Sequence, residues 1–168
     1  MHSRRLPGVL FIVLLLLASG FIVSTSGSLP PYTAAHFGAS GQADGYMTRN
    51  GYRLFMLAFS VGLPLCVVLA ISLLPRYFPR LTNIPYRTYW LAPVHWPQAL
   101  AMLDTFGYWF GCGMVALLCG VHWLVLQANL QHPAQLAHGP FFALLGSFGC
   151  LVVIWVVLFY RCFRPPPG

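Results

Sequence analysis

Charged side chains are scarce in this sequence of 168 residues, and two of the usual kinds are missing altogether. There is no lysine and no glutamate, and the acidic residues are Asp44 and Asp104. Charged residues make up 7% of the chain, against about 25% in a typical soluble domain. So few charged residues cannot cover the surface of a water-soluble domain, so a soluble globular protein is excluded. The 58% of apolar residues excludes a disordered chain.

Motifs of common enzyme classes are also missing. The sequence contains no G-x-S-x-G, H-E-x-x-H, G-x-x-x-x-G-K or G-x-G-x-x-G pattern, the marks of serine hydrolases, zinc proteases and nucleotide sites. Five cysteines are present without a C-x-x-C pair, and four of them lie within apolar runs. Neither a disulfide framework nor a zinc ribbon is indicated. We therefore expect no enzyme activity, no cofactor and no metal site.

What the chain has instead is four apolar runs, at residues 6–23, 54–74, 106–126 and 141–160. Each is close to the ~20 residues that a helix needs to cross ~30 Å of hydrocarbon. Backbone groups in hydrocarbon must bond within their own segment, so runs of this length indicate helices. We predict an all-α integral membrane protein, a single membrane domain built as a four-helix transmembrane bundle. The first run also resembles a secretory signal, but its length favours an uncleaved span.

All nine basic residues are arginines, and most of them flank the apolar runs. With the N-terminus in the cytoplasm, seven fall on the inner side: Arg4, Arg5, Arg76, Arg80, Arg87, Arg161 and Arg164. Arg49 and Arg53 fall outside. The positive-inside rule then places both termini in the cytoplasm, with an outer loop at 24–53 and an inner loop at 75–105. Because no basic stripe alternates with aromatic residues, we expect no nucleic-acid partner.

The outer loop holds the first candidate binding residues. Asp44 and Gly45 form a turn signal, and residues 32–37 and 45–48 beside it predict a short β-hairpin. We expect His36 to lie beside Asp44 and to face a partner, a peptide or an ion outside the cell. An outer metal site built from histidines stays an alternative, although no H-x-x-x-H ligand spacing is present.

Small residues predict how the spans pack, because membrane helices associate through close backbone approach. One stripe runs along the second span at a repeat of four: Ala58, Gly62, Cys66 and Ala70. A second stripe lies on the third span: Gly107, Gly111, Ala116 and Gly120. We expect these two faces to meet at the centre of the bundle. Pro64 predicts a bend in the second span.

One segment of the outer loop carries a specific pattern. Residues 29–46 read LPPYTAAHFGASGQADGY, which contains L-P-x5-H-F-x3-G-x2-D-G. With an I-P…Y-W-x-x-P pattern in the inner loop, the chain resembles bacterial membrane proteins that carry domain of unknown function 1648, a domain also found in Sdp-type toxin immunity proteins. The residues that match, besides His36 and Asp44, are Pro30, Phe37, Gly41, Gly45, Tyr89, Trp90 and Pro93. The resemblance implies a multi-pass membrane protein and, in some relatives with more spans, immunity or signalling.

The function that these features predict is contact with another protein. We expect a non-enzymatic, multi-pass protein of the bacterial inner membrane that meets the lipid bilayer and another membrane or extracytoplasmic protein, as an immunity protein or an envelope sensor does. His122, at the outer end of the third span, is a further candidate for binding a partner or an ion. A small transporter or permease component is the alternative, with Asp104 as its candidate carboxylate. A metal-binding membrane protein that uses the outer histidines is another.

Overall fold

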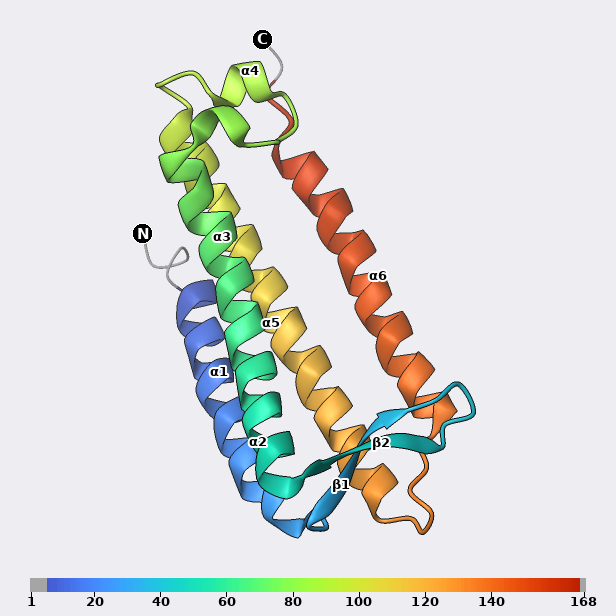
Figure 1. Ribbon diagram of the computed structural model, residues 1–168. Helices are drawn as coiled ribbons and strands as arrows, with labels where there is room; N and C mark the ends of the chain where they lie inside the picture. The colour runs from blue at the N-terminus through green and yellow to red at the C-terminus, as the bar shows by residue number, and fades with distance from the viewer. Residues whose placement is uncertain (1–5, 167–168) are drawn as a thin grey trace.

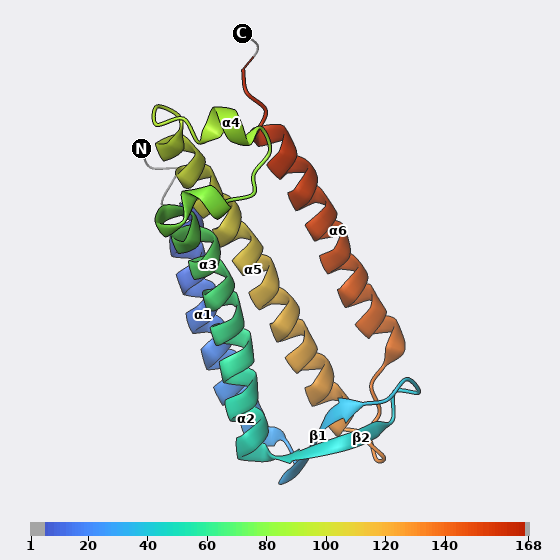
Figure 2. The same cartoon turned by 45° about the horizontal axis from the view of Figure 1, so that its top comes forward.

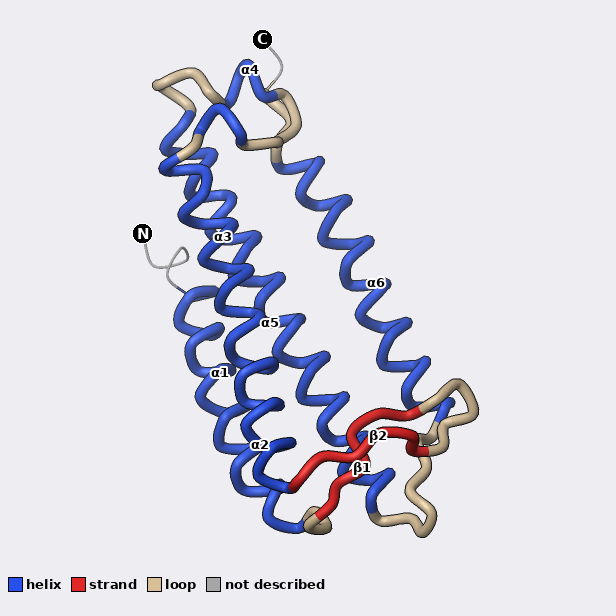
Figure 3. Tube along the Cα trace, in the orientation of Figure 1, coloured by secondary structure: helices blue, strands red, loops and turns tan. Residues whose placement is uncertain are grey.

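The computed structural model describes residues 6–166, which are mostly helical. In chain order the elements are α1 (Leu6–Thr25), η2 (Ser26–Ser28), β1 (Tyr32–Phe37), β2 (Ala43–Thr48), α2 (Arg49–Leu57), η3 (Ala58–Gly62), α3 (Leu63–Tyr77), η4 (Pro79–Leu81), α4 (Arg87–Trp90), α5 (Trp96–Asn129) and α6 (His138–Cys162). Within the described residues, four helical segments are long and apolar enough to cross a membrane: α1 with η2, α2 to α3, α5 and α6. They run side by side, with the β-hairpin at one end and α4 at the other (Figures 1 and 3).

Helix α2 begins earlier than the apolar run at 54–74 indicates. The Thr48 hydroxyl oxygen accepts a hydrogen bond from the backbone N–H of Gly51 at 3.1 Å, which caps the first turn. The polar residues from Arg49 onward are therefore helical, although none of them belongs to an apolar run.

Helix α5 is also longer than the run at 106–126. It begins at Trp96 with Pro97 in its first turn, where the N–H that proline lacks would have no helical partner. Helices α1 and α6 match the runs at 6–23 and 141–160 more closely, because polar residues or prolines stand near their ends. The loop before α2 and the loop before α5 are therefore both shorter than the stretches at 24–53 and 75–105 that the apolar runs leave.

The segment before Pro64, where the sequence predicts a bend, contains a π-helical turn. Residues 58–62 form η3, and Pro64 follows in the first turn of α3. Proline has no N–H to donate to the carbonyl of Ser60, four residues earlier. The missing bond favours a wider turn with bonds from residue i to i+5. The segment therefore passes from α2 into α3 without ending the helix.

Helix α5 is the centre of the bundle. Helices α1 and α3 pack against it on one side and α6 packs against it on another. Two views 45° apart show α6 standing apart from α1 and α3 (Figures 1 and 2). None of the residues 138–162 of α6 is buried, so α6 depends on a single row of side chains that faces α5.

The second helix packs through a different face from the one that the small residues predict. Three residues of its stripe are exposed and the fourth has open space beside it, namely Ala58, Cys66, Ala70 and Gly62. The buried face carries another set: Ser60, Pro64, Val68 and Ser72. Val68 fills a hollow on α5 that a small side chain would leave empty, and the filled contact gains dispersion energy.

The stripe on α5 does lie against neighbouring helices, but its residues have different neighbours. Gly107 packs against Ile71 of α3, and Gly120 packs against Leu144 of α6. Ala116 is exposed. The glycines of α5 are thus hollows that receive larger side chains, and they do not meet a second small-residue face.

Three helices meet at Gly111. A Cβ atom there would lie 2.5 Å from Cγ2 of Val68 on α3 and 2.7 Å from Cε2 of Phe11 on α1. Phe11 and Val68 are both buried in one apolar cluster with Cys112 and Val115 of α5. Only glycine lets α1, α3 and α5 approach this closely.

We expect Gly111→Ala to destabilise the bundle by about 1–3 kcal/mol, because the added methyl overpacks a site beside Val68, whose branched side chain is stiff. Thermal unfolding in detergent, followed by circular dichroism, measures the loss. The matched control is Gly149→Ala on α6, where a Cβ meets no heavy atom within 4 Å. Equal melting temperatures for the two variants would contradict the three-helix contact.

Candidate functional site

The β-hairpin expected from the sequence forms one end of the molecule. Strands β1 and β2 pair antiparallel, beginning with Tyr32 opposite Thr48. The register shifts on both sides of His36, which therefore lies opposite Gly45. Such irregularities twist a two-stranded ribbon and redirect its side chains. Here they turn His36 toward Asp44, the residue beside Gly45.

His36 and Asp44 meet on the outer surface of the hairpin. Nδ1 of His36 lies 2.5 Å from Oδ1 of Asp44. The ionised carboxylate only accepts hydrogen bonds, so Nδ1–H donates and Nε2 is left for another group. The two side chains are 75% and 53% exposed. Exposed ion pairs contribute only about 0–1 kcal/mol to stability, so this pair adds little to the stability of the fold. Its imidazole and carboxylate are accessible to other molecules.

Two glycines make room for this pair. A Cβ atom at Gly45 would lie 2.8 Å from Cβ of His36, and one at Gly38 would lie 3.2 Å from Oδ2 of Asp44. The prediction of a turn at Asp44 and Gly45 is wrong, because both residues lie inside β2 and the chain turns between Phe37 and Ala43. Gly45 is required by the neighbouring His36 side chain instead. The hairpin is shaped around the histidine and the carboxylate.

The tip of the hairpin is docked onto the loop between α5 and α6. Gly41 has a φ of 78° and is buried, and a Cβ atom there would lie 2.7 Å from the carbonyl oxygen of Leu136. The N–H of Leu136 donates to the carbonyl of Gly41 at 2.8 Å. Gln42 also forms a β-bridge with Gln135. Only glycine combines this positive φ with this close approach.

Asn129, at the end of α5, binds the other side of the hairpin. Its Oδ1 accepts from the N–H of Ala34 at 2.8 Å, and its Nδ2 donates to the carbonyl of Ala34 at 2.9 Å. Nδ2 also donates to the carbonyl of Val125 at 2.9 Å. The buried amide thus imitates a neighbouring strand and satisfies the backbone of β1. Together with the docked tip, it fixes the hairpin relative to the bundle.

His122 lies inside the bundle and does not reach the hairpin pair. Its side chain is fully buried at 0% exposure, stacked with Tyr52 of α2 at 5.7 Å between ring centroids and in edge contact with Phe21 of α1. Nε2 lies 2.9 Å from Oγ1 of Thr25, and Nδ1 lies 2.9 Å from Oη of Tyr52. The imidazole therefore joins α1, α2 and α5.

The hydrogen-bond network assigns the protons on this imidazole. The Thr25 hydroxyl donates to the carbonyl of Phe21 at 2.6 Å, so its oxygen accepts from Nε2–H of His122. Nδ1 then accepts from the hydroxyl of Tyr52. Both ring nitrogens of a neutral imidazole are occupied within the chain. His122 therefore links α1, α2 and α5 through hydrogen bonds, and neither of its ring nitrogens is free to bind a partner or an ion.

We expect Tyr52→Phe to lower stability by about 1–3 kcal/mol, because Nδ1 of His122 is then buried without a donor. The measurement is the melting temperature of the purified protein in one detergent. Tyr32→Phe removes the same hydroxyl from a side chain that is 75% exposed, and we expect no change there. If both variants melt at the wild-type temperature, the hydrogen bond between Tyr52 and His122 contributes nothing to the stability of the bundle.

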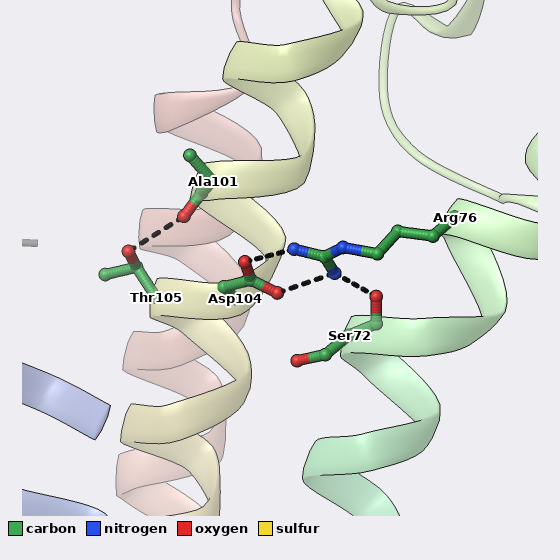
Figure 4. A network of polar contacts seen from close by, with 5 residues as sticks. All are labelled: Ser72, Arg76, Ala101, Asp104 and Thr105. Atoms are coloured by element: carbon green, nitrogen blue, oxygen red, sulfur yellow. Dashed lines mark hydrogen bonds and ion pairs between the residues drawn. The ribbon is translucent and has the colours of Figure 1, made fainter. Parts of the chain in front are cut away.

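At the opposite end, a second polar contact joins α3 to α5 (Figure 4). Arg76 donates from Nη1 to Oδ1 of Asp104 at 3.0 Å and from Nη2 to Oδ2 at 2.6 Å. The same guanidinium also bonds to the carbonyl of Ser72. Asp104 is therefore held as one half of a bidentate ion pair, a geometry that suits arginine.

The inner-loop motif residues hold the end of α6. Trp90 is buried and its indole N–H donates to the carbonyl of Phe163 at 2.7 Å. Tyr89 stacks on His95 with ring centroids 4.0 Å apart. Pro93 is exposed in the turn that leads to α5. These residues lie at the end opposite to the hairpin and form no common site with His36.

The outer motif residues, in contrast, gather in the hairpin. Leu29 is buried in the apolar cluster beneath it, and Phe37 packs against the same cluster. The carbonyl of Pro30 accepts from the hydroxyl of Thr33 at 2.9 Å. Across the described residues 6–166, no three His, Cys, Asp or Glu side chains lie close enough to hold a metal ion.

The partners of His122 and the docking amide were not found from the sequence. Thr25 and Tyr52 are 97 and 70 residues away from His122 in the chain, and Asn129 is 95 residues from Ala34. The available signal is the rarity of an asparagine or histidine at an apolar helix end, since such a group must find a partner once it is buried. That signal marks the residue but does not identify its partner.

Comparison with protein-family models, with curated proteins and with solved structures finds no match to this chain. The resemblance to proteins that carry domain 1648 therefore stays a prediction. The packing of Gly41, Gly45 and Phe37 gives a physical reason for the pattern.

Proposed function

We propose that the chain is a multi-pass membrane protein with the hairpin outside the cytoplasm and α4 inside. The support is the four long apolar helices and the distribution of charge. Arg80 and Arg87 lie in the α4 end, and Arg161 ends α6, whereas Arg49 and Arg53 begin α2 beside the hairpin. The start of α1 and the end of α6 lie toward the α4 end (Figure 1). Arg4 and Arg5, which also enter the charge count, lie outside the described residues.

We expect single cysteines to report this orientation in a variant whose five native cysteines are replaced. A membrane-impermeant maleimide should label Ser40→Cys, in the exposed turn of the hairpin, in intact cells. It should label Thr88→Cys, exposed on α4, only after permeabilisation. Mass spectrometry of the labelled protein measures both. The opposite pattern overturns the orientation, and equal labelling of both sites in intact cells overturns the membrane insertion.

The activity we propose for the site is recognition of another protein by binding, without catalysis. The observation that carries this proposal is the exposed pair of His36 and Asp44 on a hairpin that Asn129 and the loop at Leu136 hold in place. A site held rigid by its supporting contacts loses little freedom when a partner binds. The pair offers the partner a carboxylate acceptor and a free imidazole nitrogen.

The kind of partner we propose is an extracytoplasmic or membrane protein, in an immunity-like or envelope-sensing role. The resemblance to domain 1648 proteins supports that role, since some relatives act in toxin immunity. The hairpin supports it as well, because Tyr32 and Tyr46 of the same two strands are exposed. Exposed tyrosines next to polar groups are typical of protein interfaces.

The test is affinity purification after mild crosslinking in whole cells, quantified for wild type, His36→Gln and the control His132→Gln. His132 is exposed in the loop after α5, so its replacement removes a histidine from the same end of the molecule. We expect a protein that wild type and His132→Gln both enrich, and that His36→Gln enriches at least tenfold less. If no protein shows this difference while all three variants melt alike, the recognition role is refuted.

A further inference from the structure

A large apolar cavity lies at the α4 end, away from the hairpin. It has a volume of about 400 Å³ and is walled by α3, α5 and α6, with the loop between η4 and α4 over it. Helix α6 makes its main contacts with α5, and the cavity lies between α3 and α6. Its volume is within the range of ~300–1,000 Å³ that is usual for small-molecule sites.

The walls of the cavity offer a ligand almost no polar group. The lining from the three helices includes Ile71, Leu103, Phe106, Trp155 and Phe159. The one indole N–H among them donates to the carbonyl of Phe106 at 2.9 Å, so it is already satisfied. A molecule that fills this space must therefore present hydrocarbon to it, because a buried polar group would find no partner.

The loop over the cavity is different, because two arginines that do not line the cavity lie close to its polar lining residues in the chain or bond to them. The polar lining residues, Thr82 and Asn83, belong to the overlying loop. The Arg87 guanidinium binds this loop through the carbonyls of Thr82 and Arg80. Arg80 and Arg87 are both exposed.

No side-chain carboxylate of the chain is left to neutralise these arginines. The sequence has two acidic residues. Asp44 is paired with His36 on the hairpin, and both oxygens of Asp104 are bound by Arg76. These two cations must therefore find their counter-ion in another molecule.

We propose that this cavity binds one acyl chain of an anionic glycerophospholipid, with the lipid phosphate at Arg80 and Arg87. Apolar walls beside two arginines match the two parts of such a lipid, and basic pockets between membrane helices on the cytoplasmic side bind anionic headgroups. The inference rests on the proposed membrane insertion, which places these arginines at the inner leaflet. The bound lipid completes the contact between α3 and α6.

The test uses the full chain purified in detergent, given equal amounts of a phosphatidylglycerol and a phosphatidylcholine with the same acyl chains. Native mass spectrometry counts the lipids that stay bound. We expect wild type to retain phosphatidylglycerol at least fivefold more than phosphatidylcholine, and Arg87→Gln to lower this preference about fivefold. Arg161→Gln, an exposed charge at the end of α6, is the control and should keep the wild-type preference.

A second variant tests the acyl-chain site. Ala70 is exposed and lines the cavity, so Ala70→Trp should fill it and abolish retention of either lipid. Ala143→Trp, exposed on the hairpin half of α6, should retain lipid as wild type does. Equal retention of the two lipids by wild type refutes the role of the two arginines. If Ala70→Trp retains lipid as wild type does, the acyl chain does not bind in the cavity.

These outcomes stay separate from the test of the proposed function. If Ala70→Trp does not fold, Arg87→Gln still decides, because its side chain is exposed. A wild-type protein that shows the expected cysteine labelling but keeps no phosphatidylglycerol refutes only the lipid site. A protein that keeps the lipid in detergent but shows reversed labelling refutes only the orientation.

Discussion

The close approach of three helices at Gly111 is the constraint on which the bundle depends. Phe11 of α1 and Val68 of α3 both occupy the space that the side chain of any residue other than glycine would need at position 111. In a bilayer the lipid tails are as apolar as the side chains, so helices associate through such packing more than through hydrophobic transfer. The contact fixes the distance between α1, α3 and α5, whereas α6 packs mainly on α5.

Polar contacts at both ends complement this apolar centre. His122 connects α1 to α2 through Thr25 and Tyr52 near the hairpin, and the ion pair of Arg76 and Asp104 connects α3 to α5 near α4. Buried polar groups are costly unless they are bonded, so the contacts of the buried His122 select one register between its helices. The partly exposed ion pair adds a bidentate link at the other end. The position of the hairpin relative to the bundle is fixed in turn, because Asn129 at the end of α5 bonds to the backbone of β1.

The sequence predicted the parts of the site that are local. A hairpin that brings His36 and Asp44 together was predicted correctly from local patterns. Its turn was predicted at Asp44 and Gly45, which is wrong, because both residues lie in β2 and the chain turns between Phe37 and Ala43. The sequence did not predict that Gly45 clears space for the His36 side chain, because the register shift depends on the docking of the whole ribbon. The function of His122 was beyond prediction as well, since its two partners come from helices 70 and 97 residues away.

The sequence by itself predicted the mostly helical fold and the number of long apolar helices, because both follow from the length and composition of the apolar runs. Only the tertiary structure decided which face of each helix is buried. Small residues on the second helix and on α5 are equally visible in the sequence, yet α5 uses its glycines as hollows while Ala58, Cys66 and Ala70 remain exposed. Packing depends on the shapes of both partners at once, and a sequence pattern describes one helix at a time.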